Sequence, residues 1–246
     1  MIAAAVTAVQ VSGMESAQTE LLTLPNGPTR IEWRRSARAR RVSLRIDPRG
    51  GAVVVTLPPR AGRNAGMALL MSHADWVAER LAALPGAISF ADGALLPLHG
   101  EEHVVRHRPG ARGTAWREGR EIVVAGDPAF LARRVSDFLR TEAKRSLTDL
   151  AQRKARMAGV APRRITVKDT KSRWGSCAAN RNLAFSWRLV MAPAFVQDYV
   201  AAHEVAHLLH MNHSAKFWSV VTQLTPHTDT AMTWLRDHGP RLLRIG

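Results

Sequence analysis

The chain has 246 residues, of which 46% are hydrophobic and 22% are charged, a balance typical of a globular protein with a hydrophobic core. No stretch approaches the roughly 20 apolar residues that a membrane-spanning helix needs, so we expect no membrane segment. Thirty-five Lys and Arg against 20 Asp and Glu give a formal net charge of +15, which favours an anionic partner such as nucleic acid, although a solvated basic surface explains the same excess.

The N-terminal apolar stretch has neither a basic residue before it nor a cleavage site after it, so it does not fit a signal peptide. Cys177 is the only cysteine, which excludes an intrachain disulfide and favours a cytoplasmic location. We expect residues 1–29 to be a disordered or mis-annotated tail, with Met14 as an alternative start.

A small β-rich domain is predicted over residues 30–126. Polar and apolar residues alternate over 41–46, and a glycine pair then predicts a hairpin turn into a second strand at 52–57. Helical spacing over 64–83 predicts one or two short helices. Glycine and proline divide residues 87–126 into brief strands and turns.

A second domain is predicted over residues 127–246. Asp127-Pro128 resembles a helix cap followed by proline, and apolar residues then recur every three or four positions from Leu131 to Ala151, as in a long amphipathic helix. A strand over 164–169 and a hairpin over 173–191 follow. The sequence therefore predicts an α+β protein.

The next predicted helix, from Pro193 to about Met211, carries a His-Glu-x-x-His motif. His203 and His207 lie one turn apart on the same face of this helix, so that both imidazoles can bind one metal ion. Glu204 projects beside that face, where it can act as a general base without binding the metal.

His213 is the expected third ligand. It follows Asn212, a residue that can end the helix in the left-handed conformation, so a turn can fold His213 back toward the metal. His210 is a rival, but a rigid helix would then have to bring three successive turns to one ion. Three protein ligands leave a fourth position open, which is the catalytic pattern of Zn²⁺.

Other candidate residues have more ordinary explanations. Tyr199 can orient a ligand from one turn before His203, and Cys177 can approach the metal, but both are expected to be core residues. Lys171 and Arg173 can stabilise an anionic transition state or can be solvated charges. Structural or solvated roles are expected for His99, His103 and His107, and core positions around the site for Trp174, Trp187 and Trp218.

Several motifs occur in a specific order: a Lys-Ser-Arg-Trp-Gly-Ser-Cys run at 171–177, Trp-Arg-Leu-Val at 187–190, the histidine-rich run at 203–214, and Phe217-Trp218. Together they resemble the YgjP-like metallopeptidase domain, a bacterial relative of the SprT-like zincins, over about residues 30–240.

The resemblance implies a zincin-like catalytic domain, in which a long helix and a small sheet precede the helix that carries His203, Glu204 and His207, with His213 completing the site. The histidine spacing also matches metzincins, but this chain has His210 where those proteins have glycine.

The leading hypothesis is a zinc metallopeptidase that acts on peptides or proteins, with Glu204 as general base and the strand at 183–190 pairing with an extended substrate. One alternative is a zinc-dependent nucleotide or phosphoanhydride hydrolase in which Lys171, Arg173 and Arg188 bind the phosphates.

Another alternative is a nucleic-acid-associated module. We expect the Arg-rich segment from Arg34 to Arg49 and the basic face of the long helix to bind nucleic acid without sequence preference and with little base stacking. The helix residues concerned are Arg133, Arg134, Arg140, Lys144 and Arg145.

Overall fold

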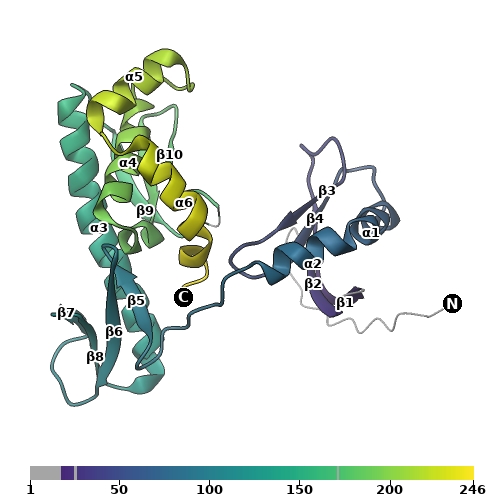
Figure 1. The fold of residues 1–246 in the computed structure, drawn as a ribbon, viewed down its shortest axis with the longest axis horizontal. Helices are drawn as coiled ribbons and strands as arrows, with labels where there is room; N and C mark the ends of the chain where they lie inside the picture. The colour runs from purple at the N-terminus through teal and green to yellow at the C-terminus, as the bar shows by residue number, and fades with distance from the viewer. Residues whose placement is uncertain (1–17, 25–26, 171) are drawn as a thin grey trace. The chain divides into compact units, whose positions relative to one another are not determined.

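The computed structural model describes residues 18–24, 27–170 and 172–246, and the chain divides into two compact units, residues 1–85 and 86–246 (Figure 1). The described residues form three small sheets and six α-helices, so the α+β class predicted from the sequence is confirmed. Within the described residues, no helix is long and apolar enough to cross a membrane.

The first unit is a four-stranded sheet with two helices. Its strand order is β1-β2-β4-β3, and the predicted hairpin is the antiparallel pair β3–β4. The elements are β1 (Gln18–Leu24), β2 (Gly27–Arg35), β3 (Ser43–Ile46), β4 (Val53–Leu57), α1 (Arg63–Ser72) and α2 (Ala74–Ala82).

The prediction of a disordered tail over residues 1–29 is wrong for residues 18–24, which form strand β1. It pairs antiparallel with β2, and its Leu22 and Leu24 are buried in the same core as Ile31 and Val55. Burial of these leucines in the core explains why the segment is ordered, although its local sequence does not indicate a strand. Residues 1–17 lie outside the described residues.

The second unit begins with the sheet β5-β6-β8-β7, which packs on the long helix α3. The strands are β5 (Leu95–Leu98), β6 (Glu101–Arg108), β7 (Ala115–Glu118) and β8 (Glu121–Ala125), and α3 is Leu131–Met157. The predicted boundary near residue 127 therefore falls inside this unit. The Asp127 side chain does accept a bond from the Ala129 N–H, but the cap starts a helix rather than a domain.

The remaining elements build a second sheet and the helices around it. The sheet order is β10-β11-β9, so β11 is central and β10 and β9 are at the edges. The elements are β9 (Arg164–Lys168), β10 (Gly175–Cys177), β11 (Asn182–Ser186), the 3-10 segment η2 (Trp187–Met191), α4 (Ala194–Ala206), α5 (Ala215–Leu224) and α6 (Thr228–Leu243). Helix α4 ends at Ala206, before the predicted end near Met211, and the N–H groups of Leu208 and Leu209 then bond to carbonyls three residues back.

A partly buried ion pair connects three helices of the second unit. Lys154 of α3 lies 2.6 Å from the Asp198 carboxylate of α4, and its ammonium also donates to the Leu224 carbonyl at the end of α5, again at 2.6 Å. The Lys154 ammonium therefore neutralises the Asp198 carboxylate and provides a donor for a carbonyl in the last turn of α5.

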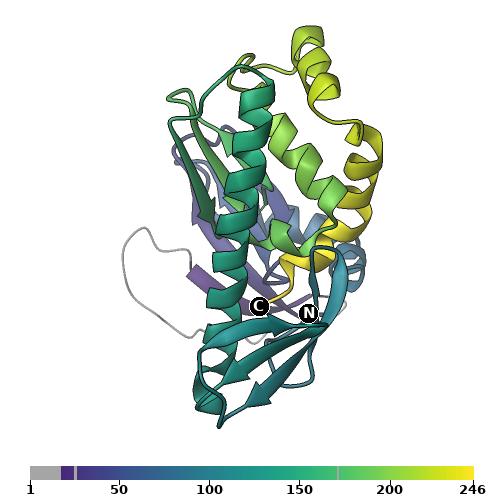
Figure 2. The ribbon, with the colours of Figure 1, turned by 90° about the vertical axis from the view of Figure 1, so that its left-hand side faces the viewer.

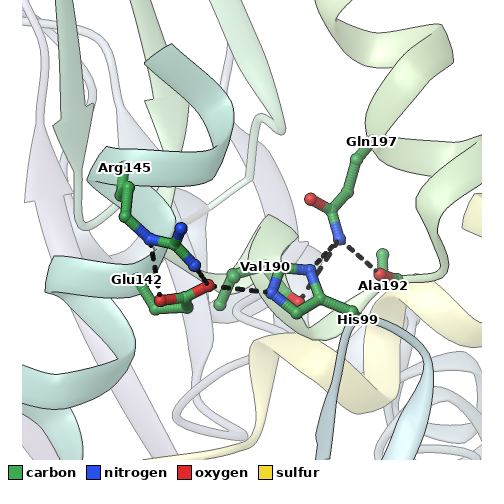
Figure 3. A network of polar contacts seen from close by, with 6 residues as sticks. All are labelled: His99, Glu142, Arg145, Val190, Ala192 and Gln197. Atoms are coloured by element: carbon green, nitrogen blue, oxygen red, sulfur yellow. Dashed lines mark hydrogen bonds and ion pairs between the residues drawn. The ribbon is translucent and has the colours of Figure 1, made fainter. Parts of the chain in front are cut away.

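A polar network joins the β5–β6 turn to α3 and to the first turn of α4 (Figure 3). His99, in the left-handed conformation at φ 53°, lies 3.1 Å from Glu142 through Nε2 and 3.2 Å from the Gln197 amide nitrogen through Nδ1. That amide nitrogen also donates to the Ala192 carbonyl at 2.7 Å. Nδ1 is therefore the acceptor, and Nε2–H donates to Glu142.

We expect Gln197→Leu to lower the free energy of unfolding by about 1–3 kcal/mol, because it leaves His99 Nδ1 and the Ala192 carbonyl without their donor. Urea denaturation of this variant and of Gln223→Leu, an exposed glutamine on α5, provides the measurement and its control. Equal midpoints for the two variants and the wild type would contradict a stabilising role for the network.

Candidate metal centre

Three histidine side chains meet at the end of helix α4. Ring nitrogens of His203, His207 and His213 all lie within 4.8 Å of one another, and the Nε2 atoms of His203 and His213 are 3.2 Å apart. His203 lies in the last turn of α4, His207 is its C-cap, and His213 lies in the loop before α5. Among the described residues, this is the group able to hold a metal ion.

The ring of His210 is not part of the cluster. Its backbone carbonyl lies 3.1 Å from Nδ1 of His207, so Nδ1–H donates there and the lone pair of Nε2 faces the other rings. Nδ1 of His203 lies 3.4 Å from the hydroxyl of Tyr199, one turn earlier on α4. Tyr199 is buried, as expected, and it also contacts a clustered histidine.

Burial favours the neutral form of His203 and His207. Burial lowers the pKa of His203 to about 4, and the nearby His207 and His213 add to the effect. Burial also lowers the pKa of His207, against the opposing effect of its bond to the His210 carbonyl. Neutral imidazole is the form that binds metal ions, so protons compete weakly for this site.

Phe217 of α5 forms an apolar wall beside all three rings. Its fully buried ring lies 5.0, 4.5 and 4.8 Å from the ring centres of His203, His207 and His213. Trp218 lies about 6 Å from two of them, at 6.0 Å from His203 and 5.9 Å from His213. This packing restricts the rotation of the imidazoles, which favours a preformed site.

Glu204 is buried next to the cluster, against Gly175 of strand β10. It is 5% exposed, and a Cβ atom at position 175 would lie 2.5 Å from its Cγ atom. Burial raises the pKa of Glu204 to about 7, while the charge of Arg173 lowers it. The Oε2 atom has no hydrogen-bond partner among the described residues. A buried, unpartnered carboxylate oxygen is rare in a structural role.

Comparison with known proteins identifies the family. The profile of a family described as "YgjP-like, metallopeptidase domain" matches residues 40–238, most of the chain. The chain belongs to the YgjP-like metallopeptidase family. The resemblance seen in the sequence motifs is thereby confirmed.

This YgjP-like protein was also compared with solved structures and with curated proteins. The crystal structure of the metallopeptidase zymogen of Pyrococcus abyssi abylysin is similar over 37% of this chain and 95% of that chain, with 20% sequence identity and a TM-score of 0.33. At this level the similarity supports no argument about the site. Comparison with curated proteins gives no match.

The donor set of the YgjP-like domain fits a catalytic metal. Three imidazoles converge, a donor set that Zn²⁺ and related transition metals prefer, and three protein ligands would leave a coordination position open. A cation held there would favour the ionised form of the nearby Glu204 carboxylate.

The other candidate residues from the sequence are not among the three clustered histidines of this YgjP-like site. Cys177 lies on β10, where its thiol contacts the Ala178 carbonyl, and it is not among the clustered donors. Lys171 lies outside the described residues. Trp187 is buried in the core, and Trp174 packs against Gly239 of α6.

Gly175 is the residue of this YgjP-like site that the sequence analysis missed. A glycine in a strand interior often marks a close approach of another group, and here that group is Glu204. The signal was therefore present in the Trp-Gly-Ser run, but only the tertiary structure shows which side chain takes the space.

Proposed function

We propose that this protein is a zinc-dependent peptidase in which His203, His207 and His213 hold the metal and Glu204 is the general base. The observation that carries the proposal is the buried Glu204 carboxylate, which has an unpartnered oxygen and belongs to the residue that follows His203, one of three convergent imidazoles. Membership in a metallopeptidase family supports the same reaction class.

When bound, zinc supplies a Lewis acid that polarises the scissile carbonyl and acidifies water. Glu204 accepts the proton of the attacking water at a carboxylate oxygen and then delivers it to the leaving amine. Burial supports both steps, because a carboxyl with a pKa raised to about 7 exchanges protons readily near neutral pH.

The strand that borders Glu204 is β10, not the 183–190 strand that the sequence suggested for substrate pairing. Because β11 is central, its backbone groups are used by its two neighbours. Trp174 and Ala178, which flank β10, bond to β11 through Ser186 N–H to Trp174 O and Ala178 N–H to Asn182 O, both at 2.9 Å.

Backbone groups alternate in direction along an antiparallel strand, so the N–H and C=O groups of Gly175 and Cys177 point away from β11. An extended peptide can pair with these groups by strand addition. Its backbone would then pass beside Glu204, which Gly175 contacts.

The alternative of a phosphoanhydride hydrolase needs Lys171, Arg173 and Arg188 to bind phosphates, and Arg188 is not available for this role. Arg188 is fully buried, with Nη1 2.5 Å from the Asp169 carboxylate, Nε donating to the Ile245 carbonyl, and the guanidinium 4.2 Å from the centre of the Trp187 ring. Arg188 therefore has a structural role and does not offer its charge to a nucleotide.

The direct test is turnover by the zinc-loaded protein on peptide and protein libraries and, in parallel, on nucleoside triphosphates. Glu204→Gln serves as the blank, so that a contaminating hydrolase is recognised. Peptide cleavage that disappears in the blank supports the proposal. Phosphate release from nucleotides by the wild type alone, without peptide cleavage, would overturn it.

Gly175→Ala is expected to reduce peptide turnover on the order of a hundredfold while zinc content is retained, because the atoms nearest to the new methyl group all belong to Glu204 and not to the histidines. Steady-state kinetics with metal analysis measures both quantities. Ser176→Ala on the same strand is the matched control and should be close to wild type. Full activity in Gly175→Ala would show that the position of Glu204 is not critical.

A further inference from the structure

Two hollows lie along one side of helix α3 and meet at Thr141, which lines both. Each encloses about 500 Å³. The first lies between the start of α3, the end of η1 (Pro128–Phe130) and the start of β7, and the second lies between the middle of α3 and β9. In Figure 2, α3 is the long vertical teal helix, with the β5–β8 sheet at its lower end.

We call these two hollows the α3 groove. Their linings share one helix face, because Arg133, Asp137, Thr141 and Lys144 are spaced by four, four and three residues. These positions span about 16 Å of helix axis. Strands β7 and β9, which border the two hollows, are each the terminal strand of their sheet. None of its lining residues belongs to the candidate metal centre.

The α3 groove is strongly basic. Its linings contain one acidic residue, Asp137, whose ion pair with Arg133 at 3.6 Å is largely exposed and therefore weak. Arg140 also bonds to Asp169, at 3.2 Å. Lys144 and Arg164 form no ion pair with a described residue. The five lining cations are Arg133, Arg134, Arg140, Lys144 and Arg164.

Aromatic rings lie among these charges at one end of the groove. Phe130 is 47% exposed, Phe138 is half-buried, and both line the first hollow. The guanidinium of Arg134 lies 5.8 Å from the centre of the Phe130 ring. An exposed ring beside cations provides a stacking surface next to sites for phosphate.

From this combination we propose that the α3 groove binds single-stranded nucleic acid with little sequence preference. A nucleic acid strand carries a negative charge and a planar base in every residue, so it uses both the line of cations and the rings. In a duplex the faces of the bases are already stacked, which leaves Phe130 without a partner. An acidic peptide would use the cations alone.

This groove contains four of the five helix residues expected from the sequence to bind nucleic acid: Arg133, Arg134, Arg140 and Lys144. The Arg-rich segment from Arg34 to Arg49 belongs to the first compact unit, whereas the α3 groove belongs to the second. Arg145 is bound to Glu142, at 2.6 Å, and does not line either hollow. Phe130 and Phe138 supply the stacking surface that the sequence analysis did not expect.

The test is fluorescence anisotropy of the full-length protein with a labelled oligothymidylate and with a duplex of equal length, across a salt series. We expect tighter binding of the single strand, with log affinity falling by about 0.7 per log unit of salt for each phosphate neutralised. Lys144→Ser should weaken binding and reduce that slope by about 0.7. Arg156→Ser, an exposed change on the same helix outside both hollows, is the matched control and should leave both unchanged.

Phe130→Ala separates stacking from charge. It should weaken binding by about fivefold to a hundredfold with an unchanged salt slope, since a stacked base contributes roughly this factor. The ring is exposed, so the variant should keep the wild-type melting temperature. Three results would each overturn the proposal: duplex binding as tight as single-strand binding, no effect of Phe130→Ala, or displacement of the oligonucleotide by polyglutamate as effectively as by unlabelled oligothymidylate.

Discussion

Replacing Glu204 with glutamine is expected to lower peptide turnover by at least about a hundredfold, the usual contribution of a general base, without loss of bound zinc. Glutamine has nearly the same shape and fits the space above Gly175, but its amide cannot accept the proton from water. Metal retention is expected because Glu204 is not one of the three clustered donors. The measurement combines kcat with the metal-to-protein ratio.

Glu118→Gln, an exposed change on β7, is the matched control for the loss of one carboxylate and should retain wild-type turnover. Unchanged kcat in Glu204→Gln would remove this residue from the mechanism. Loss of zinc in the same variant would instead identify the carboxylate as a ligand, and the assignment of the three histidines would then need revision.

Substitution of any one clustered histidine should remove the metal under conditions in which the wild type keeps about one ion per chain. We expect His203→Ala, His207→Ala and His213→Ala to bind zinc at least about a hundredfold more weakly, a larger loss than the tenfold to hundredfold that follows from changing a residue behind a ligand. Competition against a zinc chelator measures these affinities.

His210→Ala provides a stringent control, because it removes a neighbouring imidazole but keeps the backbone carbonyl that contacts His207. This variant should bind zinc with close to wild-type affinity. If His210→Ala lost the metal and His213→Ala kept it, the third ligand would be His210, and the loop before α5 would have to rearrange when metal binds.

Local sequence patterns predicted the elements that the spacing of nearby residues defines. The apolar spacing from Leu131 to Ala151 predicted α3, alternation predicted β3, and histidines four residues apart in a helix must lie on one face. The sequence placed the third histidine after a helix stop at Asn212, but that reason was wrong, because α4 ends at Ala206 and Asn212 is not left-handed. His213 still joins the cluster, since the chain turns back after His207.

Features that depend on contacts between distant segments were not predictable in this way. The β5–β8 sheet packs on α3, so the helix cap at Asp127 is not a domain boundary. The order β10-β11-β9 includes a parallel pair, which no hairpin signal reveals. The contact of Gly175 with Glu204 and the burial of Arg188 beside the C-terminal carbonyls each join residues that are far apart in the chain.

The ion pair of Lys154 and Asp198 bears on whether the protein stays folded without a metal ion. Helix α4 is packed by apolar contacts through Val205 and Ala206 and is tied to α3 and α5 by this pair, so we expect it to keep its position without an ion. Metal-free chains should therefore persist as folded molecules rather than being degraded as misfolded ones. If the chain is the zinc peptidase proposed above, a pool of such chains would act as a reserve, and its proteolytic capacity would rise and fall with zinc availability without new synthesis.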